Sequence, residues 1–307
     1  MFAGFDTSNY TTSVAFYDGE NIVQQKKLLS VKKGERGLRQ SEALFQHTVN
    51  LPELISAMPS VQKVDAVAVS ATPRCVEGSY MPCFLAGVSA ATAFAKSSDC
   101  PIYKTSHQTG HILAALYSAE CLPYIKAPFL AFHVSGGTTE ALYVCPDEER
   151  IISVDLAAES TDLKAGQLID RTGVLLGLDF PCGAELEKLA SKSSAEFKIR
   201  PSMQGVNCSL SGVENKVKAM IEKGETREDI AKFVLDYVGT TVDAMTEKLL
   251  KEYGNLPLVY AGGVMSDVLI RKRIQNKYDA KFAQSQYSCD NAAGIAVYAA
   301  LKSGKVI

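Results

Sequence analysis

The sequence predicts an α/β protein with two domains. Its 307 residues exceed what one hydrophobic core usually organises, and a hydrophobic content of 47% with 21% charged residues is typical of a globular protein. Short apolar strands alternate with amphipathic helical segments along most of the chain, as in α/β proteins. A threonine-rich strand after an apolar strand and a small-residue turn also occurs twice, at 11–17 and about 127 residues later at 138–144. We interpret this repeat as two copies of one β-hairpin unit.

The first part of the chain begins with a three-stranded meander, in which Asp18-Gly19 is the hairpin turn. A helix rich in apolar positions then ends before Pro59, and a later helix rich in alanine and glycine suits close packing on a sheet. The strands are predicted at 2–5, 11–17, 21–29, 66–69 and 101–104, and the helices at 40–58 and 80–96.

The second part starts with the other copy of the hairpin and continues with helices. Thr226 is the predicted N-cap of the longest of them, and Asp290 or Asn291 is the predicted cap of a small-residue helix that runs to Leu301. The strands are predicted at 129–134, 138–144, 256–261 and 281–283, and the helices at 161–178, from 181, at 213–223, 226–253 and 267–277.

Composition and charge exclude several classes of protein. A net charge of −2 gives no overall nucleic-acid signal, and we interpret the basic cluster between Lys26 and Arg39 as a solvated loop. The chain has no apolar run near twenty residues, and its first residues lack the basic start of a secretory signal. Its eight cysteines form no CxxC pair, which favours reduced thiols in the cytoplasm.

Two of the four histidines, His107 and His111, are spaced i and i+4. On a helix both rings leave one face, where they form a two-point site for a divalent metal such as zinc or iron(II). The alternative is a helix start with two unrelated histidines. A zincin peptidase is disfavoured, because its HExxH motif needs a glutamate base and this chain has Gln108. Asp290 is the candidate third ligand, although an aspartate before a helix is more often only a cap.

Three turns of small residues follow predicted strands, at 6–9, 135–137 and 262–263. Glycine allows the backbone to approach a ligand closely, and successive N–H groups bind phosphate oxygens. The turns therefore indicate a nucleotide held between two halves, and ordinary strand-ending glycines are the alternative. Neither a P-loop GxxxxGK[ST] nor a GxGxxG motif is present.

In these motifs the chain resembles, nearly end to end, the TsaD/Gcp proteins, which are tRNA threonylcarbamoyladenosine transferases formerly described as O-sialoglycoprotein endopeptidases. The matching stretches are 4–8, 107–111, 134–138, Asp170, 181–183, 209–212, 262–264 and 290–292. The resemblance implies the actin-like ATPase fold (ASKHA, duplicated RNase H-like), with two domains and an interdomain cleft. It implies a first domain of residues 1–104 plus 291–307 and a second domain of residues 105–290 that carries the metal site.

The resemblance also implies ligands and a reaction. The metal, iron or zinc, would be held by His107, His111 and Asp290. ATP or an adenylate, with or without magnesium, would be bound by Val134, Ser135, Gly136, Gly137, Thr138, Asp170, Gly183, Glu187 and Asp267, and the turn of Gly262 and Gly263 is a further candidate. The reaction would be transfer of a threonylcarbamoyl group from the adenylate to adenosine in tRNA, and no catalytic base is assigned. The partners would be tRNA and a homologous actin-like protein or a second copy, with no membrane.

The sequence departs from the family pattern at several positions. A glutamate between the histidines is replaced by Thr109, a histidine after the glycine turn by Thr138, an asparagine by Asp267 and a lysine by Glu214. These changes suggest a divergent paralogue whose substrate-recognition residues are altered. Two alternatives are a regulatory nucleotide-binding protein without turnover and a small-molecule kinase or ATPase of the same fold.

Overall fold

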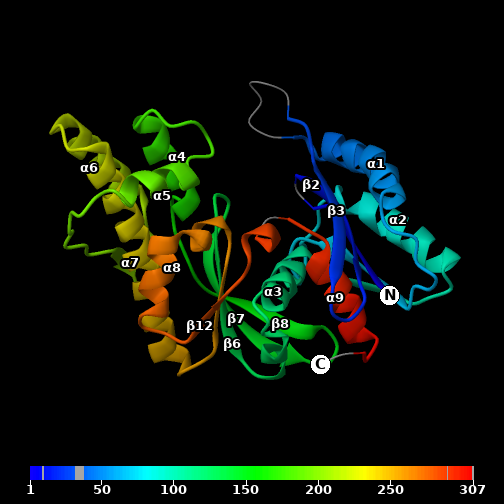
Figure 1. Cartoon of the computed structure of the whole chain (residues 1–307). Helices are drawn as coiled ribbons and strands as arrows, with labels where there is room; N and C mark the ends of the chain where they lie inside the picture. Colours follow the sequence, from blue (N-terminus) through cyan, green and yellow to red (C-terminus); the bar gives the residue numbers. More distant parts are fainter. Residues whose placement is uncertain (9, 32–37, 289, 306–307) are drawn as a thin grey trace. The chain divides into compact units, whose positions relative to one another are not determined.

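The computed structural model describes residues 1–8, 10–31, 38–288 and 290–305. The chain forms two compact units, with the elements labelled in Figure 1. The first unit comprises Met1–Ala127, Cys145–Val154 and Gln286–Ile307, and the second comprises Pro128–Val144 and Asp155–Ser285. Parts of the predictions above lie outside the described residues: position 9 of the first turn, positions 32–37 of the basic cluster, one of the eight cysteines, Cys289, and positions 306–307 of the predicted first domain.

The first unit is built on a five-stranded sheet with the order β3-β2-β1-β4-β5. Its strands are β1 (Phe2–Asp6), β2 (Thr11–Tyr17), β3 (Ile22–Leu28), β4 (Ala66–Thr72) and β5 (Ile102–Ser106). β1 pairs antiparallel with β2 and parallel with β4, so it lies in the middle of the sheet. All residues of β1 and β2 are buried, as expected for central strands that are covered on both faces.

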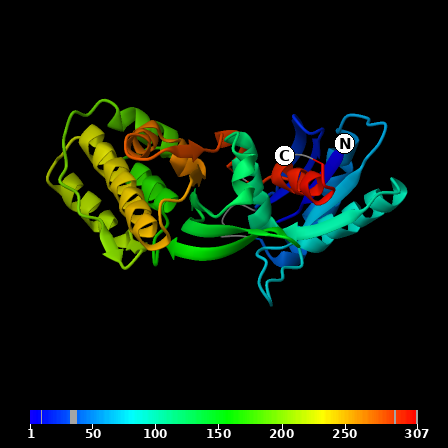
Figure 2. The ribbon, with the colours of Figure 1, turned by 90° about the horizontal axis from the view of Figure 1, so that it is seen from below.

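Helices cover this sheet. They are α1 (Gln40–Ser56), α2 (Phe84–Ser97), α3 (His107–Ser118), the 3-10 helix η1 (Leu122–Lys126) and α9 (Ala293–Lys302). The core between α1, α2 and the sheet includes Phe5, Val67 and Leu51. α9, red in Figure 2, packs against both α3 and β1. The C-terminal helix is therefore part of the unit that the N-terminus begins.

The second unit repeats the topology of the first. Its sheet has the strands β6 (Phe129–Val134), β7 (Thr139–Asp147), β8 (Ile151–Glu159), β11 (Leu258–Ala261) and β12 (Ala280–Phe282), in the order β12-β11-β6-β7-β8. The end of β7 and the start of β8 fall within Cys145–Val154, which belongs to the first unit. β6 pairs antiparallel with β7 and parallel with β11, and β11 pairs parallel with β12. β6, β7 and β11 thus correspond to β1, β2 and β4, so the hairpin duplication predicted from the threonine-rich strands is confirmed.

Helices and two short strands complete the second unit. They are α4 (Ala165–Leu175), α5 (Gly183–Ala190), β9 (Ser202–Gln204), β10 (Asn207–Ser209), α6 (Ser211–Glu222), α7 (Arg227–Tyr253), η2 (Gly263–Ser266) and α8 (Val268–Gln275). The hydroxyl of Thr226 accepts the N–H of Asp229, which confirms the predicted cap of α7. Among the described helices, none combines the length and apolar character that crossing a bilayer requires.

The two units differ from the predicted division of the chain, because α3 belongs to the first unit and not to the second. The physical reason is a close approach of backbones. A Cβ added to Gly294 of α9 would lie 1.9 Å from the Gly110 carbonyl oxygen of α3, and one added to Gly4 of β1 would lie 2.4 Å from the Ala296 nitrogen. Glycine at these positions lets α9 pack directly on its two neighbours.

This contact generates a stability prediction. We expect Gly294→Ala to lower the free energy of unfolding by about 3 kcal/mol, because the added methyl group overlaps backbone atoms of α3 that cannot move aside cheaply. The matched control is Gly212→Ala in α6, where an added Cβ meets nothing within 4 Å. Urea unfolding followed by circular dichroism would measure both variants. Equal stability of Gly294→Ala and the parent protein would contradict the prediction.

Candidate metal centre

The two histidines of the HxxxH motif lie in the first turns of α3. β5 ends at Ser106, whose extended backbone and side chain cap the helix, because its Oγ accepts the N–H of Thr109 at 3.1 Å. The cap fixes the helix start at His107 and so places His111 one turn later on the same face. The two ring centroids are 4.2 Å apart, with 70° between the ring planes.

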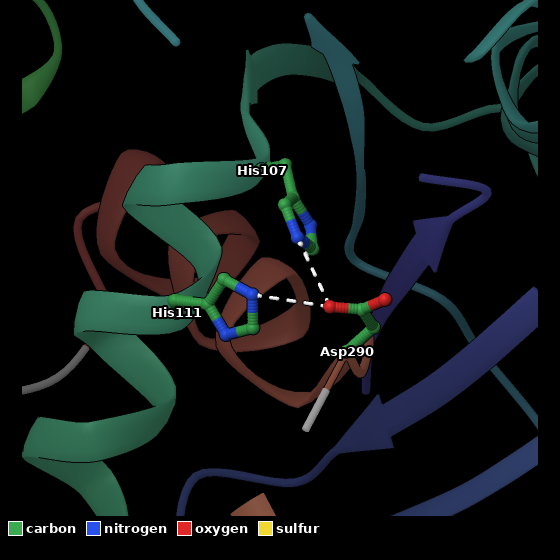
Figure 3. Close-up of side chains that lie close together, drawn as sticks. All are labelled: His107, His111 and Asp290. Carbon is green, nitrogen blue, oxygen red and sulfur yellow. Dashed lines mark ion pairs between the residues drawn. The ribbon is translucent and has the colours of Figure 1, made fainter. Parts of the chain in front are cut away.

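Asp290 joins this pair from the segment before α9 (Figure 3). Its Oδ1 lies 3.3 Å from Nε2 of His107 and 3.4 Å from Nε2 of His111. The three side chains are partly exposed, between 16% and 21%. The neighbouring Asn291 contacts the helix start, because its Oδ1 accepts the N–H of Ala293 at 3.0 Å. The carboxylate of Asp290 therefore faces the imidazoles and not the helix end.

The donor set and its spacing fit a divalent metal ion. Two imidazole nitrogens and a carboxylate oxygen are ligands that zinc and iron(II) accept. With zinc–ligand bonds of about 2.0–2.1 Å, the edge of a tetrahedral site is about 3.3–3.4 Å, and the two histidine–aspartate separations are 3.3 and 3.4 Å. The ligand atoms of all three residues lie within 4.8 Å of one another. Little rearrangement would be needed to place an ion among them.

Two residues of the first turn also contact His107. Asp6, which is 1% exposed, places Oδ2 2.6 Å from Nδ1 of His107. Ser8 donates its N–H to Oδ1 of Asp6 at 2.7 Å, and its Oγ lies 2.8 Å from the same Nδ1. A Ser–His–Asp catalytic triad needs the serine and the aspartate on different ring nitrogens, so this arrangement is not one. The Asp6 carboxylate thus contacts the nitrogen that does not face Asp290, whereas the Ser8 Oγ also lies 3.4 Å from Nε2.

The charge states of His107 and the neighbouring carboxylates depend on one another. Burial opposes a positive charge on His107, but the carboxylates of Asp6 and Asp290 outweigh it and raise the pKa of His107 to about 10. Burial likewise disfavours the Asp290 carboxylate, yet its hydrogen bonds with His107 and His111 hold its pKa below the usual value. The two carboxylates therefore favour positive charge at this site.

In the second unit, the turn after β6 gathers backbone N–H groups. The Oγ of Ser135 accepts hydrogen bonds from the amides of Gly137 at 3.3 Å and Thr138 at 3.1 Å. Gly136 and Gly137 are exposed, and Val134 before them is buried. A hydroxyl that accepts two hydrogen bonds still has its own O–H to donate. The turn can thus present several donors to an anion.

Glycines bring two further elements to this turn. A Cβ on Gly166 at the start of α4 would lie 2.5 Å from the Gly136 nitrogen, and one on Gly262 would lie 2.1 Å from the Val134 oxygen. Gly262 has a φ of 100°, which favours glycine, and Gly263 begins η2. The structure therefore brings the 134–137 and 262–263 turns together at the carboxyl ends of the parallel strands β6 and β11.

The remaining residues predicted for nucleotide binding make contacts with backbone amides. Asp170 of α4 accepts the N–H of Cys182 at 2.8 Å, next to Gly183 at the start of α5. Glu187 of α5 accepts the N–H of Val268 at 3.0 Å. Asp267 caps α8 by accepting two further amides. Glu187 and Asp267 thus meet at the start of α8.

Sequence reasoning missed a role for Asp162. Its carboxylate accepts hydrogen bonds from the hydroxyls of Ser209 and Ser211 at 2.5 Å and from the Leu210 amide at 2.8 Å. These contacts hold the Ser-Leu-Ser-Gly stretch at the start of α6. They also lower the pKa of Asp162 well below its usual range, against the opposing effect of burial. Asp162 lies in a polar loop, which has no hydrophobic periodicity from which its contacts with the start of α6 could be predicted.

Comparison with solved structures shows the fold. The chain is similar to the (R)-2-hydroxyglutaryl-CoA dehydratase component A of Acidaminococcus fermentans, with a TM-score of 0.55, 14% identity and 99% of each chain covered. It is also similar to HypF in a phosphate- and nucleotide-bound form, with a TM-score of 0.57 and 13% identity, covering 99% of this chain and 55% of that one. These likenesses and the duplicated sheets confirm the actin-like ATPase fold.

Comparison by sequence shows the family. A tRNA N6-adenosine threonylcarbamoyltransferase of Thermosipho africanus (strain TCF52B) is 30% identical over 317 residues, covering 96% of this chain and 92% of the relative. The family model described as TsaD, tRNA N6-adenosine threonylcarbamoyltransferase, matches residues 21–297. The chain therefore belongs to the TsaD family of tRNA N6-adenosine threonylcarbamoyltransferases.

Proposed function

We propose that this chain is a metal- and nucleotide-dependent transferase that moves a threonylcarbamoyl group from an adenylate to the amine of adenosine in tRNA. The ion, iron or zinc, would be held by His107, His111 and Asp290. The observation that carries the proposal is the convergence of these three ligand atoms at separations that suit such an ion. Family membership supplies the reaction class.

The nucleotide is proposed to bind in the second unit, with its phosphates at the 134–138 turn. The amides of Gly137 and Thr138 orient the Ser135 hydroxyl, and this hydroxyl and the N–H of the exposed Gly136 suit phosphate oxygens. HypF, a protein with this fold, has been solved in a phosphate- and nucleotide-bound form, which supports the same use of the fold here. Gly262 and Gly263 would contribute to the same site at the carboxyl ends of β6 and β11. The site would also be lined by Asp170, Gly183, Glu187 and Asp267. The phosphates would bind with or without magnesium.

The transfer has a simple balance of bonds. The acceptor nitrogen forms a bond to the carbamoyl carbon, the bond from that carbon to the adenylate oxygen breaks, AMP leaves, and the amine gives up a proton. When bound, a divalent metal supplies Lewis-acid polarisation of a carbamoyl or phosphate oxygen. The Ser135 hydroxyl and the Gly136 amide would stabilise negative charge on the phosphate. We assign no side chain as general base. Gln108 cannot take a proton, which argues against the peptidase activity once attributed to the family.

Two of the departures from the family pattern have local partners in the structure. Thr109 is buried, and its hydroxyl lies 2.9 Å from the Ser106 Oγ at the helix cap. Glu214 forms ion pairs with Arg171 at 3.0 Å and with Lys218 at 2.9 Å. The carboxylate thus takes up positive charge where the family has a lysine. We propose that these changes alter recognition of the acceptor substrate and leave the metal and nucleotide sites in place.

The proposal predicts that the purified protein carries one divalent ion per chain and that a His107→Ala, His111→Ala double variant loses it, because two of three ligands are removed. Native mass spectrometry would report metal and nucleotide in the same spectra. His133→Ala, on β6, is the matched control and should keep the ion. Transfer of threonylcarbamoyl to tRNA should fall at least a hundredfold in the double variant.

Two results would count against the proposal. A double variant that retains one ion per chain would remove the metal assignment. Failure of the parent protein, with metal and adenylate both bound, to modify tRNA or to rescue a strain that lacks its own transferase would remove tRNA as the acceptor.

Asp267 generates a prediction of pH dependence. Burial, with Glu187 nearby, raises the pKa of Asp267 to about 6, although the amides of Leu269 and Ile270 favour its anion. An unfolded aspartate has a pKa of about 3.9. Between these values the native state holds a proton that the unfolded state has lost, so this group makes stability fall as pH rises from about 4 to 6.

Asp267→Asn, which keeps the capping oxygen, should therefore be more stable than the parent by about 1–2 kcal/mol at pH 7.5 and equal to it at pH 4. The two amide hydrogen bonds and the helix N-terminus keep this figure below the full value for a two-unit shift. Urea unfolding between pH 4 and 7.5 would measure it, with the exposed Asp179→Asn as control. A gain that does not change with pH would contradict the assignment.

A further inference from the structure

Asp6 is a buried carboxylate that no part of the proposed reaction uses. It ends β1, the central strand of the first unit, and is 1% exposed. Its Oδ2 lies 2.6 Å from Nδ1 of His107, a residue 101 positions away in the chain. A buried carboxylate is costly unless charged or polar partners compensate it, so this contact is a specific arrangement.

The two nitrogens of His107 face different partners. Nδ1 faces Asp6, and Nε2 faces Oδ1 of Asp290 at 3.3 Å. A carboxylate accepts hydrogen bonds and does not donate them, so Nδ1 must carry a proton in this contact. In the neutral ring Nε2 is then the nitrogen with the free electron pair, and it points to the side of the ring where His111 also lies.

We propose that Asp6 is the positioning residue of the metal site: its carboxylate holds the Nδ1–H of His107 and thereby directs Nε2 to the ion. This inference rests on the metal site of the proposed function and adds a residue that the sequence motifs did not assign to it. Carboxylate–histidine–metal arrangements of this kind set the tautomer and the ring orientation of a ligand, and their loss typically weakens metal binding by 10–100-fold.

Asp6 is itself held in place. Its Oδ1 accepts the N–H of Ser8 at 2.7 Å, which orients the carboxylate at the end of the strand. Gly4, two residues earlier, packs against Ala296 of α9, the helix that follows Asp290. β1 is thus fixed both to α9, the helix that follows the ligand Asp290, and, through Asp6, to the ligand His107 on α3. The ring of His107 is held from two sides by rigid elements.

Asp6→Asn tests the inference with almost no change in shape. Its Oδ1 can still accept from Ser8, but its NH₂ group would face Nδ1 and favour the tautomer with the proton on Nε2, the nitrogen needed for the metal. We expect the variant to bind Zn²⁺ at least tenfold more weakly than the parent protein, measured by competition with a chelating dye. Asp65→Asn is the matched control. Its carboxylate is in the same unit, in ion pairs with the N-terminus, Lys63 and Lys305, and its affinity should be unchanged.

Nitrogen-15 spectra of histidine-labelled protein give a second measurement that needs no variant. In the zinc-loaded parent protein we expect His107 to show a protonated Nδ1 and a metal-bound Nε2. A metal-bound Nδ1 would overturn the inference, as would equal Zn²⁺ affinity in Asp6→Asn and the parent. A parent protein that binds no Zn²⁺ or Fe²⁺ would overturn the proposed metal site and this inference together, so the two failures are distinguishable.

Discussion

The packing of α9 against α3 and β1 is the contact on which the candidate metal centre depends. Asp290 lies directly before α9, both histidines are on α3, and Asp6 ends β1. Backbone approaches that only glycine permits, at Gly294 and Gly4, fix α9 against its two neighbours. The site is therefore built by three elements that are far apart in sequence and close-packed in space, and not by a flexible loop that gathers around an ion.

Much of the fold could be predicted from local patterns. Apolar and β-branched runs predicted nearly all strands of both sheets, and the threonine-rich repeat predicted the duplication. The predicted cap at Thr226 lies at the start of α7. β8 was not predicted. Its surface positions alternate irregularly, and half-exposed strands carry a weak signal. The division of the chain was taken from the family resemblance, and the packing of α3 on α9 within the first unit has no signal in local periodicity.

The residues of the candidate site, too, could be predicted from the sequence only in part. The i, i+4 spacing was sufficient to place His107 and His111 on one face, because helix geometry is local. Asp290 could be named as a candidate third ligand but not told apart from a helix cap. In the structure its carboxylate lies beside the two histidines, and Asn291 accepts the N–H of Ala293. The contact of Asp6 with His107 and the anchor at Asp162 could not be predicted, since each depends on tertiary pairing between polar residues that have no periodic pattern.

The order of the elements along the chain has a consequence for how the protein is made. Most of the second unit, 155–285, is contiguous, whereas the first unit needs α9, which leaves the ribosome after all the other elements described above. Domains usually fold in the order of their synthesis. Here the unit begun first must wait until α9 has been made, and its histidines emerge long before their carboxylate partner. Loading of the proposed metal site would thereby need a chain that extends past Asp290, and a product terminated before that residue would display the HxxxH pair without the proposed third ligand.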